Sequence, residues 1–154
     1  MSEYLVYDVF TDTPFGGNQL AVFPDATALP EERLQSIAAE FNFSEVTFCY
    51  PPEADGTARV RIFTPTMEVP FAGHPTVGTA IALHDLGHPA EQLLELGVGP
   101  IPVRVDANRA AFTTRVPLER LSDPDAALCA RCLSLSPGQV VGTPVQASLG
   151  LPFT

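Results

Sequence analysis

The chain has few basic residues, since 8 Lys and Arg stand against 18 Asp and Glu and give a formal net charge of −10. A phosphate backbone or an anionic membrane surface repels such a protein, so we expect no nucleic-acid or membrane partner. The sequence also lacks an apolar run long enough to span a bilayer. Its N-terminus, MSEYLVYDVF, has no basic segment followed by a cleavage site. These features predict a cytoplasmic protein.

Cysteine is scarce, and the odd number of three is typical of a reducing compartment rather than of a disulfide scaffold. Cys129 and Cys132 form a C-x-x-C pattern without a second pair, so we expect partly buried helical side chains there and no zinc or redox site. His84 and His88 have a metal-compatible spacing but no third ligand. Because no phosphate loop or dinucleotide fingerprint occurs either, the sequence predicts neither a metal nor a cofactor.

What the chain does contain is ample apolar sequence, 45% of its residues, punctuated by 16 Pro and 11 Gly. This composition predicts one domain with a real core, built from many short elements joined by tight turns. Residue patterning predicts helices over 30–40, 75–86 and 125–133, the last capped by the Ser122-Asp123-Pro124 segment. It predicts short strands over 4–10, 20–23, 45–50, 58–63, 92–96, 101–105, 110–115 and 140–149.

The segment 61–80, RIFTPTMEVPFAGHPTVGTA, carries the most information. A strand and a proline-containing turn lead to Gly73, His74 and Pro75 at the start of a helix. Gly73 lets a ligand approach the backbone, and the free N–H groups and dipole of a helix start favour a carboxylate or phosphate. Because the helix that follows is small and apolar on every side, we expect it to be buried. This predicts an anion site on a rigid core element.

Glu45 is the strongest candidate for proton transfer, because the apolar residues around it disfavour the charged form of its carboxyl group. The plainer interpretation is a solvated glutamate at a strand edge. His74 could bind a carboxylate or relay a proton, although an isolated histidine is more often a structural hydrogen bonder. Asn18 belongs to a Gly-Gly-Asn segment that by itself predicts only a turn.

Three motifs in this order, GGNQLAV (16–22), EFNFSEVTF (40–48) and the 61–80 segment, resemble the N-terminal half of the PhzF family of phenazine-biosynthesis-type isomerases. The resemblance implies an α+β fold, one lobe of the diaminopimelate-epimerase-like type, with a mainly antiparallel sheet wrapped around a central buried helix. It places this lobe at residues 1–149 and the start of the crossing to a second lobe at residues 150–154.

The resemblance also assigns roles within the site. Glu45 matches the catalytic acid/base carboxylate of the family, His74 and Gly73 match the residues that hold the substrate carboxylate, and Asn18 matches a residue that lines the cleft. These matches imply cofactor-independent isomerisation of a small dihydro-hydroxyanthranilate-like acid. Ala72 stands where related racemases and epimerases of this fold carry a catalytic cysteine, which favours carboxylate chemistry.

A typical family member has a second lobe, which supplies an opposing acidic residue across the cleft and would follow Thr154. We therefore expect either a truncated product, a half-enzyme completed by a second copy or a second-lobe chain, or a non-catalytic descendant. The expected partners are a small carboxylate substrate and a homodimer mate or second-lobe chain. The alternative functions are a non-catalytic binding or interaction domain, and a racemase or epimerase.

Overall fold

The computed structural model describes residues 2–114, 117–149 and 152–153, and the chain divides into two compact units, residues 1–114 and residues 115–154. We call them the N-terminal and C-terminal units. The lobe boundary expected at residue 149 falls later than this division and stays a prediction. Of the expected crossing segment, residues 150, 151 and 154 lie outside the described residues.

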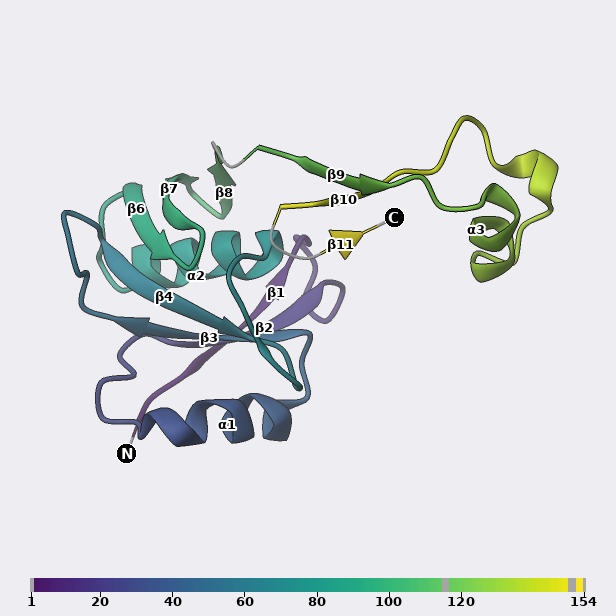
Figure 1. Ribbon diagram of the computed structural model, residues 1–154. Helices are drawn as coiled ribbons and strands as arrows, with labels where there is room; N and C mark the ends of the chain where they lie inside the picture. The colour runs from purple at the N-terminus through teal and green to yellow at the C-terminus, as the bar shows by residue number, and fades with distance from the viewer. Residues whose placement is uncertain (1, 115–116, 150–151, 154) are drawn as a thin grey trace. The chain divides into compact units, whose positions relative to one another are not determined.

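The N-terminal unit contains an eight-stranded sheet (Figure 1), with strand order β1-β2-β3-β4-β6-β7-β8 and β5 paired to β4. The strands β2–β3 and β4–β6 pair in parallel, and the other neighbours are antiparallel. The α+β fold with a mainly antiparallel sheet is therefore confirmed. The strands are β1 (Leu5–Val9), β2 (Asn18–Phe23), β3 (Glu45–Tyr50), β4 (Ala58–Phe63), β5 (Glu68–Val69), β6 (Glu91–Leu96), β7 (Gly99–Asp106) and β8 (Arg109–Phe112).

Helix α2 (Gly73–Asp85) is the expected central helix, and it packs against strands from both edges of the sheet, β1 and β8 included. It begins two residues earlier than predicted, so Pro75 is its third residue and still lies in the first turn, where a missing N–H costs little. Two polar side chains tie the helix to the sheet: Thr79 Oγ1 donates to Thr47 Oγ1 at 2.9 Å, and Gln92 Nε2 donates to the Ala80 carbonyl at 2.9 Å. Among the described residues, no helix combines the length and apolar character needed to cross a membrane.

Helix α1 (Leu34–Phe41), preceded by the 3-10 turn η1 (Glu31–Arg33), lies on the opposite side of the sheet from α2 (Figure 1). Side chains alternate along β3, so Val46 and Phe48 pack into the α1-side core whereas Thr47 faces α2. Glu45 shares the parity of Thr47. The sheet therefore directs this carboxyl group toward the central helix.

The C-terminal unit has a three-stranded sheet in the order β11-β10-β9, made of β9 (Glu119–Ser122), β10 (Gln146–Ser148) and β11 (Pro152–Phe153), with α3 (Ala126–Cys132) and the 3-10 turn η2 (Pro137–Gln139). The predicted strand over 140–149 was too long, because Gly142 adopts a positive φ of 84° within it. The predicted helix cap was also wrong: the Asp125 side chain accepts the Leu128 N–H at 2.9 Å. Among its described residues only Ala130 is buried.

Candidate active site

Three chain segments far apart in sequence meet at the start of α2. Glu45 opens β3, His74 is the second residue of α2, and Asn18 opens β2. The parallel register sets Leu20 opposite Glu45, which brings the first residues of β2 and β3 to the same end of the sheet. The structure therefore brings together the residues that the sequence singled out from three separate motifs.

Glu45 and His74 are in direct contact, which the sequence did not predict. Glu45 Oε2 lies 2.8 Å from His74 Nδ1, and the two side chains are only 16% and 7% exposed. No hydrogen-bond partner exists among the described residues for the buried atoms Glu45 Oε2 and His74 Nε2, so the short approach lacks hydrogen-bond alignment. Buried polar atoms are normally satisfied, and unsatisfied ones call for an explanation such as a ligand.

Gly73 forms the first residue of α2, with Ala72 as an extended cap. A Cβ atom added at Gly73 would meet only the Phe112 ring, at 3.7 Å, which is an ordinary van der Waals contact. The packing of the unit therefore does not require glycine here. Because the first N–H groups of a helix have no intrahelical acceptor, close approach of an anion gives a physical reason for the residue.

Asn18 is exposed, and its amide is oriented by a neighbour of Glu45. Ser44 Oγ donates to Asn18 Oδ1 at 3.0 Å, which leaves the amide nitrogen on the other side of the group. The preceding Gly17 is required by packing, because a Cβ there would come within 2.4 Å of the Val9 carbonyl oxygen. The segment first interpreted as a plain turn thus fixes Asn18 at the edge of the site.

Sequence reasoning missed Phe10, which follows β1 and was included in a predicted strand. Its ring centroid lies 6.2 Å from that of His74. It adopts a φ of 65° and is 75% exposed. The sequence offered one hint, an aromatic residue directly before the TDTPFGGN turn.

Thiol chemistry has no support in the N-terminal unit. Its one cysteine, Cys49, is 1% exposed, and burial raises the pKa of its thiol to about 12. The extended residue at the helix start is Ala72, which carries no ionisable group. A thiolate base is therefore absent where the carboxylate of Glu45 is present.

The described residues contain no group of three or more His, Cys, Asp or Glu side chains placed to hold a metal ion. His84 Nδ1 lies 2.9 Å from the His88 carbonyl oxygen, an interaction that closes the end of α2. Cys129 of α3 is half-buried and Cys132 is exposed.

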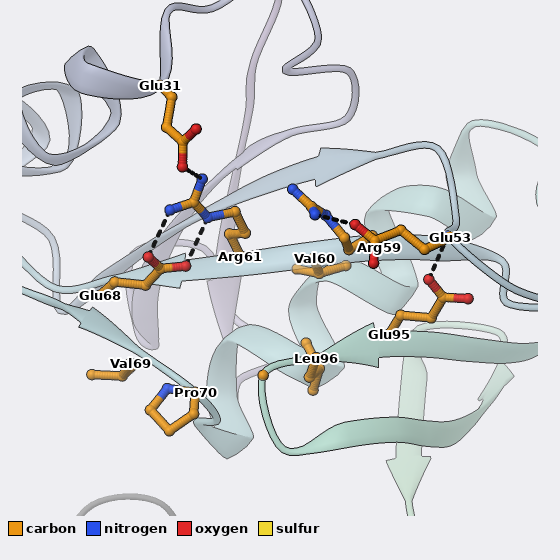
Figure 2. Close-up of a pocket in the computed structure, with 11 residues that line it drawn as sticks. Glu31, Glu53, Arg59, Val60, Arg61, Glu68, Val69, Pro70, Glu95 and Leu96 are labelled. Carbon is orange, nitrogen blue, oxygen red and sulfur yellow. Dashed lines mark hydrogen bonds and ion pairs between the residues drawn. The ribbon is translucent and has the colours of Figure 1, made fainter.

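A separate hollow of about 570 Å³ lies beside β4, on the side of η1 (Figure 2). All three guanidinium nitrogens of Arg61 donate there: its Nε and Nη2 donate to the two oxygens of Glu68 at 2.7 Å each, and its Nη1 donates to Glu31 at 2.7 Å. These bonds, with that to Glu68 contributing most, raise the pKa of Arg61 above its usual range. Arg59 pairs with Glu53 in the same hollow. Both arginines of the hollow are engaged by carboxylates of the chain itself, so we interpret the hollow as structural.

Comparison with known proteins identifies the relationship. The family model described as "Phenazine biosynthesis-like protein" (PhzC-PhzF) matches residues 7–148. The chain belongs to this family. PhzF relatives include trans-2,3-dihydro-3-hydroxyanthranilate isomerase of Pseudomonas aeruginosa, which is 43% identical over 136 residues, or 84% of this chain and 49% of that protein. The protein of the same name from Pseudomonas fluorescens is 53% identical over 83 residues, or 54% of this chain and 30% of that protein.

Solved structures share the fold of this chain. A predicted epimerase from Pseudomonas aeruginosa matches 99% of this chain and 57% of its own chain, with a TM-score of 0.83 and 35% identity. A hydroxyproline epimerase from Agrobacterium vitis, at 13% identity, 97% coverage of this chain, 49% of its own and a TM-score of 0.61, shares the fold alone. The chain spans about half the length of the curated relatives that it matches most extensively.

Proposed function

We propose that this chain supplies one lobe of an isomerase that moves a proton within a small carboxylate-bearing acid of the dihydro-hydroxyanthranilate type, without a cofactor. The observation that carries the proposal is the contact between Glu45 and His74, two side chains that are largely buried and that each keep a buried atom without a hydrogen-bond partner. Relatives named as trans-2,3-dihydro-3-hydroxyanthranilate isomerase support the reaction class.

In this proposal, residues at the start of α2 bind the substrate, and Glu45 at the start of β3 transfers the proton. The amides near Gly73 and the imidazole of His74 hold the substrate carboxylate, and Asn18 donates its amide N–H groups from the edge of the site. Glu45, as a carboxylate, takes a proton from one ring carbon, and the acid so formed, which exchanges its proton with solvent, delivers one to another ring carbon while the double bonds of the ring shift. Because the carboxylate is fixed, this transfer becomes effectively intramolecular.

A second lobe is part of the proposal. The C-terminal unit leaves large apolar side chains exposed, among them Leu118, Leu133 and Val141 at 66%, 67% and 96%. Exposed apolar surface of this kind favours association. We propose that a second copy in a two-fold arrangement, or a second-lobe polypeptide, covers it. In a homodimer two Glu45 carboxyl groups would face one cleft, in place of the opposing acid that the PhzF resemblance implies.

A proton-exchange experiment tests the proposal. The purified chain is incubated in D₂O with trans-2,3-dihydro-3-hydroxyanthranilate, product is followed by NMR, and the mass is measured by light scattering in the same buffer. We expect isomerised product that carries deuterium, formed by a dimer or by a complex with a second-lobe polypeptide. An assembled protein that binds the acid without turning it over would contradict the isomerase and support a non-catalytic binding domain.

Light scattering also tests the assembly by itself. A clean monomer of 16.4 kDa at micromolar concentration would refute the homodimer.

A further inference from the structure

The ring of Phe10 lies beside the Glu45–His74 contact and is open to solvent. Its centroid is 6.2 Å from that of His74, with the two rings tilted by 52°, and the residue is 75% exposed. It also borders a cavity of about 680 Å³ together with Val77 and Ile81 of α2, although Glu45, Gly73 and His74 are not among the residues that line this cavity. An exposed aromatic face thus stands next to a buried imidazole whose Nε2 has no hydrogen-bond partner among the described residues.

The backbone holds Phe10 there in an unfavourable conformation. Its φ of 65° is left-handed, a region that bulky residues rarely adopt outside strained or functional positions. The turn that follows is tied down by its own hydrogen bonds: the Phe15 N–H donates to Asp8 Oδ2 at 2.8 Å, and the Gly16 N–H donates to the Thr13 carbonyl at 3.1 Å.

A second aromatic side chain lies near the start of α2. The ring of Phe112, at the end of β8, would lie 3.7 Å from a Cβ added at Gly73, and it is fixed by an edge contact with Phe71 at a centroid distance of 5.5 Å. Phe112 is half-buried whereas Phe10 is mostly exposed. Phe10 is therefore the aromatic ring near the site that is free to present a face to a ligand.

We propose that Phe10 is a specificity-determining residue, whose ring packs against the unsaturated ring of the bound acid. It makes the site select acids with an unsaturated six-membered ring, flattened by its double bonds, over saturated acids of the same size and charge. This inference rests on the proposed function, because it takes the carboxylate to be held at Gly73 and His74. Stacked or tilted aromatic pairs contribute beyond their buried area, so a planar ring gains where a puckered one does not.

The chain offers a matched control in Phe15. This residue lies in the same turn, is 94% exposed and has a φ of 66°, and among the described residues its ring makes no contact with His74. A Phe15→Leu variant therefore repeats the change of residue and of backbone preference without touching the site. A Phe10→Tyr variant keeps an aromatic face and serves as the conservative rescue.

The experiment is calorimetric titration of the protein with benzoate and with cyclohexanecarboxylate, which share a carboxylate and differ in the ring. We expect wild type to bind benzoate more tightly than cyclohexanecarboxylate. This ratio of affinities should fall about fivefold in Phe10→Leu and should be retained in Phe10→Tyr and Phe15→Leu. An unchanged ratio in Phe10→Leu, with circular dichroism showing the native fold, would overturn the inference and leave the carboxylate site standing. Failure of wild type to bind either acid would overturn the proposed function, and the inference with it.

Discussion

Two groups of acidic and basic side chains lie in the N-terminal unit. They differ in how the polar atoms of their side chains are hydrogen-bonded. At the Glu45–His74 contact, each partner keeps a buried atom without a hydrogen-bond partner among the described residues. In the hollow beside β4, all three nitrogens of the Arg61 guanidinium donate to carboxylates of Glu68 and Glu31. Because the charge of Arg61 is already engaged by two carboxylates, we infer that the hollow stabilises the fold, whereas the Glu45–His74 contact keeps unpartnered buried atoms on both residues for a ligand.

The largest expected effect is on kcat, which should fall when the Glu45–His74 contact is changed but not when the hollow is changed. In the assembled protein, Glu45→Gln should lower kcat by on the order of a thousandfold, because the amide cannot accept and return the proton. Glu68→Gln removes one carboxylate charge from the hollow beside β4 and should leave kcat unchanged. Steady-state kinetics on both variants decides between them, and a Glu45→Gln enzyme with near wild-type kcat would sink the assignment.

The second expected effect, on the affinity for a ligand, should also distinguish the Glu45–His74 contact from the hollow. We expect His74→Gln to weaken the affinity for anthranilate by about tenfold to a hundredfold, since a charge-assisted bond to the carboxylate is lost. Arg61→Gln removes a positive charge outside the site and should leave the affinity unchanged. Titration calorimetry on the two variants measures this, and equal affinity of His74→Gln and wild type would make His74 structural.

The third expected effect is on folding stability, and here the hollow beside β4 should matter. Arg61→Met leaves Glu68 and Glu31 without their shared partner, and we expect the free energy of unfolding to fall by about 1–2 kcal/mol in urea denaturation. Arg104→Met is the matched control, because the Arg104–Glu91 ion pair is long, at 3.4 Å, and its side chains are 73% and 76% exposed. If both variants lose equally little, the hollow has no stabilising role.

The smallest effect concerns Glu95, which lines the hollow (Figure 2). Its carboxylate accepts the backbone N–H groups of Glu53, Ala54 and Gly56. The bond from Glu53, followed by the other two, lowers the pKa of Glu95 from its ordinary 4.5. A lowered pKa stabilises the folded state above pH 4.5, and this contribution is lost as the pH falls through the folded-state value.

The melting temperature of wild type should therefore exceed that of Glu95→Gln slightly at pH 7, and the difference should shrink toward pH 3. Glu91→Gln serves as the control, because it removes another exposed carboxylate of β6, one that does not hold a loop through its backbone N–H groups. A difference for Glu95→Gln that persists unchanged at pH 3 would contradict the linkage.

The sequence was sufficient to predict the elements that carry the site but not the contact between them. A glycine, a histidine and a proline opening an apolar helix have a local physical reason, so α2 could be predicted, and its start was in error by only two residues. The contact of Glu45 with His74 depends on which face of β3 turns toward α2, and no local pattern encodes that choice. Phe10 was missed because strand-like composition conceals a left-handed residue.

The C-terminal unit was harder to predict, and for a different reason. Gly142 and Pro144 interrupt an apolar stretch whose strand pairing depends on distant partners, and only residues 146–148 pair within it. Asp125 replaced the expected cap because its side chain reaches the Leu128 N–H, a choice among neighbouring cap-forming residues that propensity alone does not make.

The enclosure of α2 by strands from both edges of the sheet also governs when the site can form during synthesis. The helix contacts β1 near the beginning of the chain and β8, which ends at Phe112. A ribosome must therefore have released more than a hundred residues before the walls around His74 are complete, and contacts so distant in sequence form slowly. Until then the small apolar helix is exposed to water, at the stage when the future active site is still open.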